Sequence, residues 1–215
     1  MDRKTKVTKT GRAADERKSL IDRFAQALLA LVSQIPSSGE GKSKSPRERA
    51  RTLILKASAK AAVVSGTLAL PPGPFGVLTI VPDLLKVWDI QRQLIADIAA
   101  VYGKSPYLDE SSMIHCLFRH TAGQAVRDIV TRVGERFVVR RAGLRVIQRV
   151  LRRVGVVLTQ RGIGRALSRW LPIIGALGIG GYAFWDTTHV GNNAIEFFEA
   201  EIEQEGPEPT ATETA

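Results

Sequence analysis

The chain has 215 residues, of which 31 are Lys or Arg and 21 are Asp or Glu, so its formal net charge at pH 7 is +10. This length corresponds to about one domain and excludes a large multidomain enzyme. The positive charge favours anionic partners such as nucleic acid, phospholipid or acidic protein. Because Cys116 is the only cysteine, an internal disulfide framework and a multi-cysteine metal site are excluded.

The first part of the chain divides into three predicted segments. Residues 1–12 carry five basic residues and no apolar run, which indicates a disordered basic arm. In residues 13–36 apolar side chains recur every three or four positions, which predicts an amphipathic helix. Residues 37–45 are rich in Ser, Gly and Lys, so we expect a flexible linker there.

A helical domain is predicted over residues 46–203. Its first helix begins at Pro46 and runs into a stretch without charge, which ends at a proline cluster and resumes up to Val81. Each arm of this hairpin is about 15 Å long, half of a hydrocarbon core of roughly 30 Å. The hairpin at residues 61–82 is therefore expected to be buried or re-entrant. A further helix is predicted from Asp83, after Pro82, with Gly103 as its C-cap.

The second half of the domain is rich in arginine. Residues 110–169 contain thirteen arginines and no lysine. Gly134, Gly143, Gly155 and Gly162 are expected to divide it into short helices, and only residues 136–140 have the pattern of a short strand. Sixteen uncharged residues follow at 170–185, and a disordered acidic tail is predicted at 204–215. The predicted fold class is all-α: a compact multi-helix domain with two apolar segments that Gly and Pro interrupt.

Three landmarks along the chain resemble the EcsC family of bacterial proteins. They are the hairpin at residues 61–82, the series Asp83, Gln91, Ile95, Ala99, Tyr102 and Gly103, and the segment Pro172–Ala176 followed by Ala194, Phe197 and Phe198. The resemblance covers about residues 46–200, and this chain departs from it at Ile179, where a further glycine is expected. It implies a helical, membrane-associated protein without a settled activity, and it transfers no catalytic residue.

The arginine spacing is the most informative pattern in the sequence. The seven candidate residues for binding an anionic surface follow one another at four-residue steps in two series: Arg132, Arg136 and Arg140, and then Arg141, Arg145, Arg149 and Arg153. On a helix this spacing places the guanidinium groups along one ridge. Such a ridge suits an anionic phospholipid surface. The alternatives are a solvated face, arginines paired with the acidic tail, and nucleic-acid binding, which the scarcity of aromatic residues in this region disfavours.

The uncharged segments supply the candidate residues for apolar insertion or helix packing. These are Gly66, Leu70, Phe75 and Leu78 in the first segment, and Gly175, Ala176, Gly178, Gly180 and Gly181 in the second. Small residues of this kind let helices approach closely. The segments could form the core of a soluble domain, enter one leaflet, or include a span over residues 171–195. A span would place Asp186 in hydrocarbon, at a cost of about 3 kcal/mol.

The sequence indicates no catalytic, cofactor-binding or metal-binding residues. His115, Cys116 and His120 are too few for a structural zinc site. Asp89 and Asp97 could share a flank of one helix, which leaves a paired acid and base as an alternative. No cofactor is therefore expected.

Together these patterns predict a non-enzymatic accessory protein of the inner face of a bacterial membrane, cytoplasmic and peripheral, bound through Arg-rich helices and shallow apolar hairpins. An anionic phospholipid surface is the expected partner, with a membrane protein or a second copy of the chain as further candidates. A soluble helical adaptor or homo-oligomer, whose Gly-rich segments form its core or subunit interface, is the alternative. An enzyme with an unrecognised site is the third.

Overall fold

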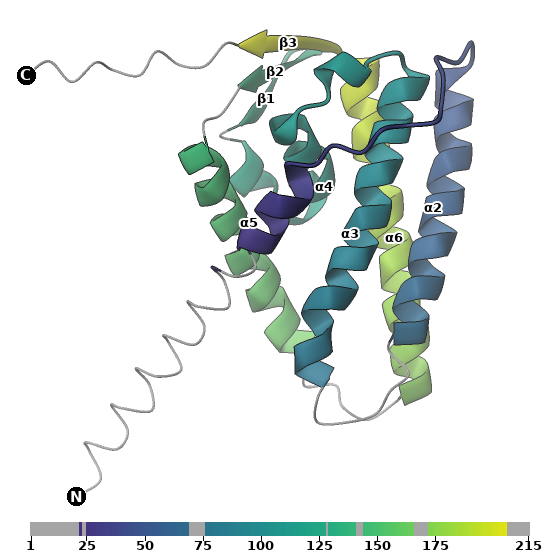
Figure 1. The fold of residues 1–215 in the computed structure, drawn as a ribbon, viewed down its shortest axis with the longest axis vertical. Helices are drawn as coiled ribbons and strands as arrows, with labels where there is room; N and C mark the ends of the chain where they lie inside the picture. Colours follow the sequence, from purple (N-terminus) through teal and green to yellow (C-terminus); the bar gives the residue numbers. More distant parts are fainter. Residues whose placement is uncertain are drawn as a thin grey trace, which may run out of the picture.

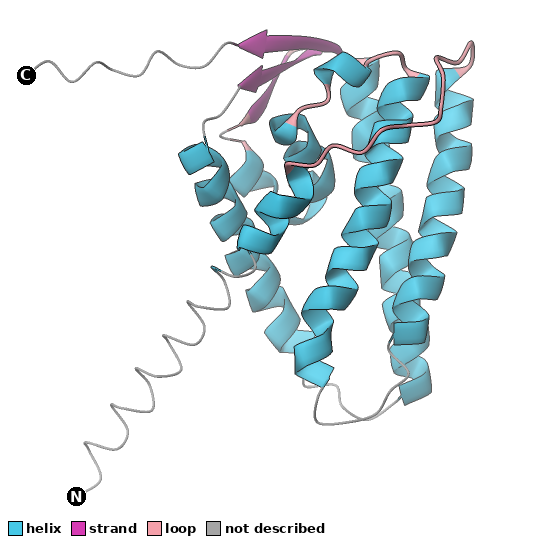
Figure 2. Ribbon diagram, in the orientation of Figure 1, coloured by secondary structure: helices cyan, strands magenta, loops and turns pink. Residues whose placement is uncertain are grey.

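Helices dominate the computed structural model, which describes residue 22 and residues 25–68, 76–127, 129–140, 144–165 and 172–205. Helical residues account for 74% of the residues that the structure describes. The predicted all-α, multi-helix fold is thereby confirmed. A small three-stranded sheet lies at one end of the helices (Figure 2). The basic arm predicted at residues 1–12 lies outside the described residues.

Three long helices form the main layer of the molecule: α2 (Pro46–Leu68), α3 (Gly76–Val101) and α6 (Pro172–Glu199). α6 packs against both α2 and α3, and α2 also packs against α3. The C-terminal end of α2 and the N-terminal ends of α3 and α6 lie at the same end of the bundle (Figure 1). The described parts of the two uncharged segments therefore lie side by side.

Two further helices complete the helical part. α4 (Glu110–Val126) packs on α6, and α5 (Leu144–Arg165) packs on α4. A short 3₁₀ helix, η1 (Ser105–Tyr107), precedes α4. Asp109 caps α4 by accepting a hydrogen bond from the backbone N–H of Ser112 at 2.8 Å. Gly103 follows α3 with a φ of +68°, which confirms the predicted C-cap because this conformation strains residues that have a Cβ.

The sheet consists of β1 (Val130–Val133), β2 (Arg136–Arg140) and β3 (Glu201–Glu205), in the order β1-β2-β3. β1 and β2 form an antiparallel hairpin, whose two-residue turn has Gly134 at its first position with a φ of +61°. β3 pairs with β2 in parallel. The sequence indicated β2 alone. β3 also includes Gln204 and Glu205, which were assigned to the disordered tail, while residues 206–215 lie outside the described ones.

Two expected helix boundaries are wrong. α3 is continuous through Pro82, so Asp83 does not begin a helix. α5 is continuous through Gly155 and Gly162, so these glycines do not divide it. A proline inside a helix costs about 3 kcal/mol, through one lost hydrogen bond and a clash of its ring, and a glycine costs about 1 kcal/mol. Tertiary packing outweighs both effects, because most helical stability in proteins comes from the buried face.

The N-terminal segment is helical at residues 25–32 and crosses the front of the bundle (Figure 1). Its buried side chains are Ala25, Leu28 and Val32. Arg92 on α3 holds its C-terminal end by donating from Nη1 to the carbonyl oxygens of Leu31 and Gln34, at 2.9 and 2.8 Å. These contacts satisfy two of the carbonyl groups that a helix end leaves without partners.

Residues 37–45, predicted as a flexible linker, make defined hydrogen bonds to α3. The Ser38 hydroxyl donates to Oδ1 of Asp97 at 2.7 Å, and the backbone N–H of Ser43 donates to the carbonyl oxygen of Val101 at 3.0 Å. The expectation of a flexible linker does not account for these bonds. The segment is held by hydrogen bonds from its polar groups and not by buried apolar side chains. Amino-acid composition does not indicate such hydrogen bonds.

The main core joins the helices to the sheet. Phe118, Phe137, Phe197 and Phe198 are its largest fully buried side chains. Phe137 on β2 lies 5.2 Å from Phe197 on α6, measured between ring centroids. The sheet is therefore fixed to α6 by aromatic packing, which is worth about 1 kcal/mol per pair beyond the apolar area it buries.

Candidate functional site

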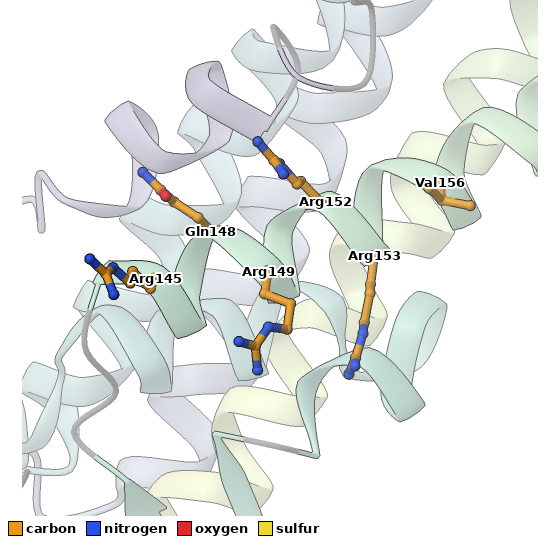
Figure 3. A pocket seen from close by; sticks show the side chains of 6 residues that line it. All are labelled: Arg145, Gln148, Arg149, Arg152, Arg153 and Val156. Atoms are coloured by element: carbon orange, nitrogen blue, oxygen red, sulfur yellow. The ribbon is translucent and has the colours of Figure 1, made fainter. Parts of the chain in front are cut away.

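α5 presents an exposed basic surface, which we call the α5 arginine face. It consists of Arg145, Arg149, Arg152 and Arg153 (Figure 3). The opposite side of the helix is buried through Ile147, Val150, Leu151 and Val154. Arg149 and Arg153 extend to one side of the helix, whereas Arg152 extends to the other (Figure 3). Together with Gln148 and Val156, the four arginines line a depression of about 360 Å³.

The charge of the α5 arginine face is only partly neutralised. Nε of Arg152 lies 3.1 Å from a carboxylate oxygen of Asp22. Within the described part of the chain, Arg145 and Arg149 take part in no ion pair. The face therefore keeps a positive potential that an external anion can use.

The structure separates the seven arginines that the sequence placed on helical ridges. Arg145, Arg149 and Arg153 lie on one helix as expected, and Arg141 lies outside the described residues. The ridge of Arg132, Arg136 and Arg140 is wrong, because these three residues belong to the β1–β2 hairpin. Val, Thr and Phe alternate with the arginines there and favour strands, and Gly134 supplies the turn.

The hairpin arginines pair with the acidic end of the chain. Nη1 of Arg136 lies 3.2 Å from Oε2 of Glu203 on β3, and Arg132 forms an ion pair with Glu196 at the end of α6. The alternative in which arginines pair with acidic residues near the C-terminus therefore holds for these two. The α5 arginine face remains as the basic surface to explain.

Glu196 is held by two arginines. Arg119 on α4 donates from Nη1 and Nη2 to its carboxylate at 2.7 and 3.0 Å, and Arg132 reaches the same group from β1. Both guanidinium groups lie over the ring of Phe137, at 5.8 and 5.7 Å from its centroid. The hydrogen bonds from Arg119 lower the pKa of Glu196 below its usual value. This clamp joins α4, α6 and the sheet and is structural.

Some of the small residues predicted for apolar insertion or helix packing contact another helix of the chain, and others have no close neighbour. A Cβ on Gly180 would lie 3.0 Å from the carbonyl oxygen of Ala62 on α2 and 3.9 Å from Cα of Gly66, so these glycines bring α2 and α6 together. A Cβ on Gly178 or Gly181 would meet nothing within 4 Å. Leu70 and Phe75 lie outside the described residues. Leu78 belongs to α3, and Gly175 and Ala176 belong to α6.

Three aromatic side chains are exposed on α6 close to its uncharged part. Tyr182, Phe184 and Trp185 keep between 37% and 48% of their surface accessible. The ring of Trp185 packs against that of His189 with 4.1 Å between centroids, and Tyr182 continues the row at 5.8 Å. Exposed aromatic residues on one short stretch of helix indicate a contact surface.

A polar network lies between α3, α4 and α6. Nε2 of His120 donates to Oδ1 of Asp186 at 2.8 Å, and Nε2 of Gln91 donates to the other oxygen of the same carboxylate at 2.8 Å. The side chains of His120 and Asp186 are 8% and 13% exposed. Nδ2 of Asn193 donates to Nδ1 of His120 at 3.3 Å, so both imidazole nitrogens have partners. The sequence did not indicate this network, because its members are distributed over three helices.

A histidine–carboxylate pair can move protons when a nucleophile or substrate is within reach. Cys116 is not such a nucleophile, because burial raises the pKa of its thiol. Among the described residues, no group of three His, Cys, Asp or Glu side chains is placed to hold a metal ion. The hydrogen bonds of the network join α3, α4 and α6.

His115 is buried without a polar partner. In the described part of the chain neither of its ring nitrogens has a hydrogen-bond partner, and its ring packs against those of Phe137 and Phe197. Burial lowers the pKa of His115 to about 3 from its usual value of 6.5. The folded state therefore holds a neutral imidazole at pH values where the unfolded chain binds a proton.

We expect this imidazole to make the protein sensitive to mild acid. Below pH 6.5 the unfolded state gains a proton that the folded state does not accept until about pH 3. Stability is therefore complete above pH 6.5, and from pH 7 to pH 5 this group removes roughly 2 kcal/mol. Urea unfolding of the wild type and of His115→Phe at both pH values measures the effect. The variant should lose the smaller amount, and equal losses would contradict the assignment.

No helix within the described ranges is long and apolar enough to cross a bilayer. Comparison of the chain with protein-family models, with curated proteins and with solved structures gave no match. The fold and the site thus define a mostly helical protein with a small sheet and an exposed basic helix. The function is argued from these features alone.

Proposed function

We propose that the protein binds the anionic surface of a bacterial membrane as a non-enzymatic, peripheral accessory protein of the cytoplasmic face. The observation that carries this proposal is the α5 arginine face, where four guanidinium groups project from one amphipathic helix. Each cation held near the headgroups contributes about 1 kcal/mol, and Arg152 is paired with Asp22, so Arg145, Arg149 and Arg153 supply about 3 kcal/mol before screening by salt. Binding of this strength is reversible.

The distribution of charge supports a lipid surface over nucleic acid. α5 buries its apolar side and exposes Leu144 and Val156 at either end of the arginine face. Exposed apolar residues beside cations suit the boundary between headgroups and acyl chains. Among the described residues, the exposed aromatic side chains lie on η1 and α6 and none lies on α5, so the described part of α5 offers no platform on which bases could stack. The resemblance of the sequence to the EcsC family agrees with this proposal.

Sedimentation with vesicles tests the proposal. We expect the purified chain to pellet with vesicles that contain phosphatidylglycerol and to stay in the supernatant with vesicles of phosphatidylcholine alone, because only the former carry net negative charge. Equal pelleting with both would exclude an electrostatic origin. Retention in the supernatant with both would reject the proposal.

A second candidate is a soluble helical adaptor or homo-oligomer. The observation in its favour is that Gly66 and Gly180 serve contacts within the chain, where they let α2 and α6 approach. Part of the small-residue pattern is thereby used in the protein's own core. The sedimentation experiment separates the two candidates, because an adaptor of this kind would pellet with neither vesicle.

A further inference from the structure

The depression on α5 is surrounded by positive charge that its own helix does not balance. α5 has six arginines and no Asp or Glu between Leu144 and Arg165. Arg145, Arg149 and Arg153 follow one another at four-residue steps, and like charges at this spacing on a helix repel one another. An anion that binds among them relieves this repulsion, so the helix favours an anionic ligand.

The carboxylate of Asp22 shows which chemistry this face accepts. Its Oδ1 atom lies 3.1 Å from Nε of Arg152, across from α5 on the N-terminal segment. Among the ion pairs of the described residues, none involves Arg145 or Arg149. Two guanidinium groups, one helical turn apart, therefore keep their charge for a ligand from outside.

The geometry of the depression limits the size and the charge of that ligand. A volume of about 360 Å³ is at the small end of ligand clefts, so it suits a headgroup and not a whole lipid. A planar guanidinium group can donate two parallel hydrogen bonds to one phosphate. A phosphodiester carries a single negative charge, so two phosphates are needed to neutralise Arg145 and Arg149.

The spacing of the arginines requires the two phosphates to be linked closely. Cβ atoms four residues apart on a helix lie about 5–6 Å from each other. Arg149 and Arg153 extend to the same side of α5 (Figure 3), and Arg145 lies one turn before Arg149. One phosphate beside Arg149 and Arg153 and a second beside Arg145 therefore lie within the reach of a short linker.

We propose that the depression on α5 binds a ligand with two phosphate groups joined by a short linker, as in the headgroup of cardiolipin. The inference rests on the proposed function and adds a preference among anionic lipids to it. A surface that attracted lipids by net charge alone would have no such preference, because it would respond only to the density of charge.

Vesicles of matched charge test the preference. Cardiolipin carries two phosphates, so vesicles in which one cardiolipin replaces two phosphatidylglycerol molecules keep the same surface charge. We expect the chain to bind the cardiolipin vesicles at least about fivefold more tightly, because the linker makes binding of the second phosphate an intramolecular step. Sedimentation over a range of lipid concentrations measures both affinities.

Variants that conserve charge separate geometry from electrostatics. Arg145→Lys combined with Arg149→Lys keeps both charges but replaces the planar groups by ammonium groups, which bind phosphate as point charges. This double variant should lose the preference for cardiolipin and bind phosphatidylglycerol vesicles within about twofold of the wild type. Arg47→Lys combined with Arg51→Lys is the matched control, because these two exposed arginines have the same spacing on α2. The control should keep the preference.

Inorganic pyrophosphate distinguishes a lipid headgroup from a soluble ligand. In calorimetric titration without vesicles it should bind the wild type more tightly than the double lysine variant of α5. If it does so while the vesicles show no preference, the site takes a soluble compound with two phosphates. If neither the vesicles nor pyrophosphate reveals a difference, or if the double lysine variant keeps the cardiolipin preference, the site is wrong and the proposed function stands. A chain that neither pellets with vesicles nor binds pyrophosphate would contradict both.

Discussion

Replacing Arg145, Arg149 and Arg153 together by glutamine is expected to weaken binding to anionic vesicles about 100-fold. Each of these cations contributes about 1 kcal/mol near a headgroup surface, and every 1.4 kcal/mol is a factor of ten in affinity. All three side chains are exposed on α5, so their loss should not unfold the domain. Vesicle sedimentation of the variant and the wild type measures the change.

A control with the same loss of charge separates the position of the arginines from net charge. Lys44, Arg51 and Lys56 lie in or just before α2, on a different helix from the α5 arginine face, and all three are exposed. Their replacement by glutamine should weaken binding by no more than about threefold, since charges farther from the surface than a Debye length are largely screened. If this control loses as much affinity as the α5 variant, the α5 arginine face has no special role.

Replacing Gly191 by alanine is expected to destabilise the fold by about 1–3 kcal/mol. A Cβ at this position would lie 2.3 Å from Cγ1 of Ile54 on α2 and 3.3 Å from Cδ2 of Leu94 on α3. Both neighbours are buried, so neither can move away without displacing the core. Urea unfolding measures the loss, and the strain should outweigh the gain of about 1 kcal/mol that alanine brings to a helix interior.

Gly181 is the matched control on the same helix. A Cβ there would meet nothing within 4 Å, so Gly181→Ala should leave stability unchanged or raise it by up to about 1 kcal/mol. Combining Gly191→Ala with Ile54→Ala should recover part of the loss, because the second change removes the atoms that clash. If the two glycine variants behave alike, or if the double variant is strictly additive, the close contact between α2 and α6 is not the cause.

Helical periodicity predicts much of this fold. Apolar residues at three- and four-residue spacing mark the buried sides of the helices, and Gly103 and Pro46 lie at ends that the structure confirms. The proline cluster after Leu70 also predicts that α2 and α3 form a hairpin. These features are local, and local sequence determines them.

The sheet could not be predicted in the same way. β3 is a run of alternating glutamates that resembles a solvated tail, and only its parallel pairing with β2 makes it a strand. Arg132 and Arg136 are four residues apart, a spacing that is compatible with a helix and also with a strand hairpin. Their ion pairs with Glu196 and Glu203 form in the hairpin. Contacts between segments that are distant in the sequence therefore determine both the strand β3 and the positions of the two arginines.

The candidate site was partly predictable for a related reason. The period of four correctly placed Arg145, Arg149 and Arg153 on one helix, whereas Gly191 was not distinguished from the other glycines of α6. A glycine indicates that two helices approach closely only when the residue opposite it is known. The residue opposite Gly191 is Ile54, which lies on another helix, so the sequence of α6 alone does not reveal the contact. The polar network around Asp186 likewise needs three helices to be in place.

The salt dependence of binding by the wild-type chain tests the central claim most directly. We predict that its partition coefficient on phosphatidylglycerol vesicles falls at least about tenfold between 0.05 and 0.5 M NaCl, because the Debye length shortens from about 14 Å to about 4 Å and screens the α5 arginine face from the phosphates. Binding that does not change with salt, or no binding at the lowest salt, would contradict the account.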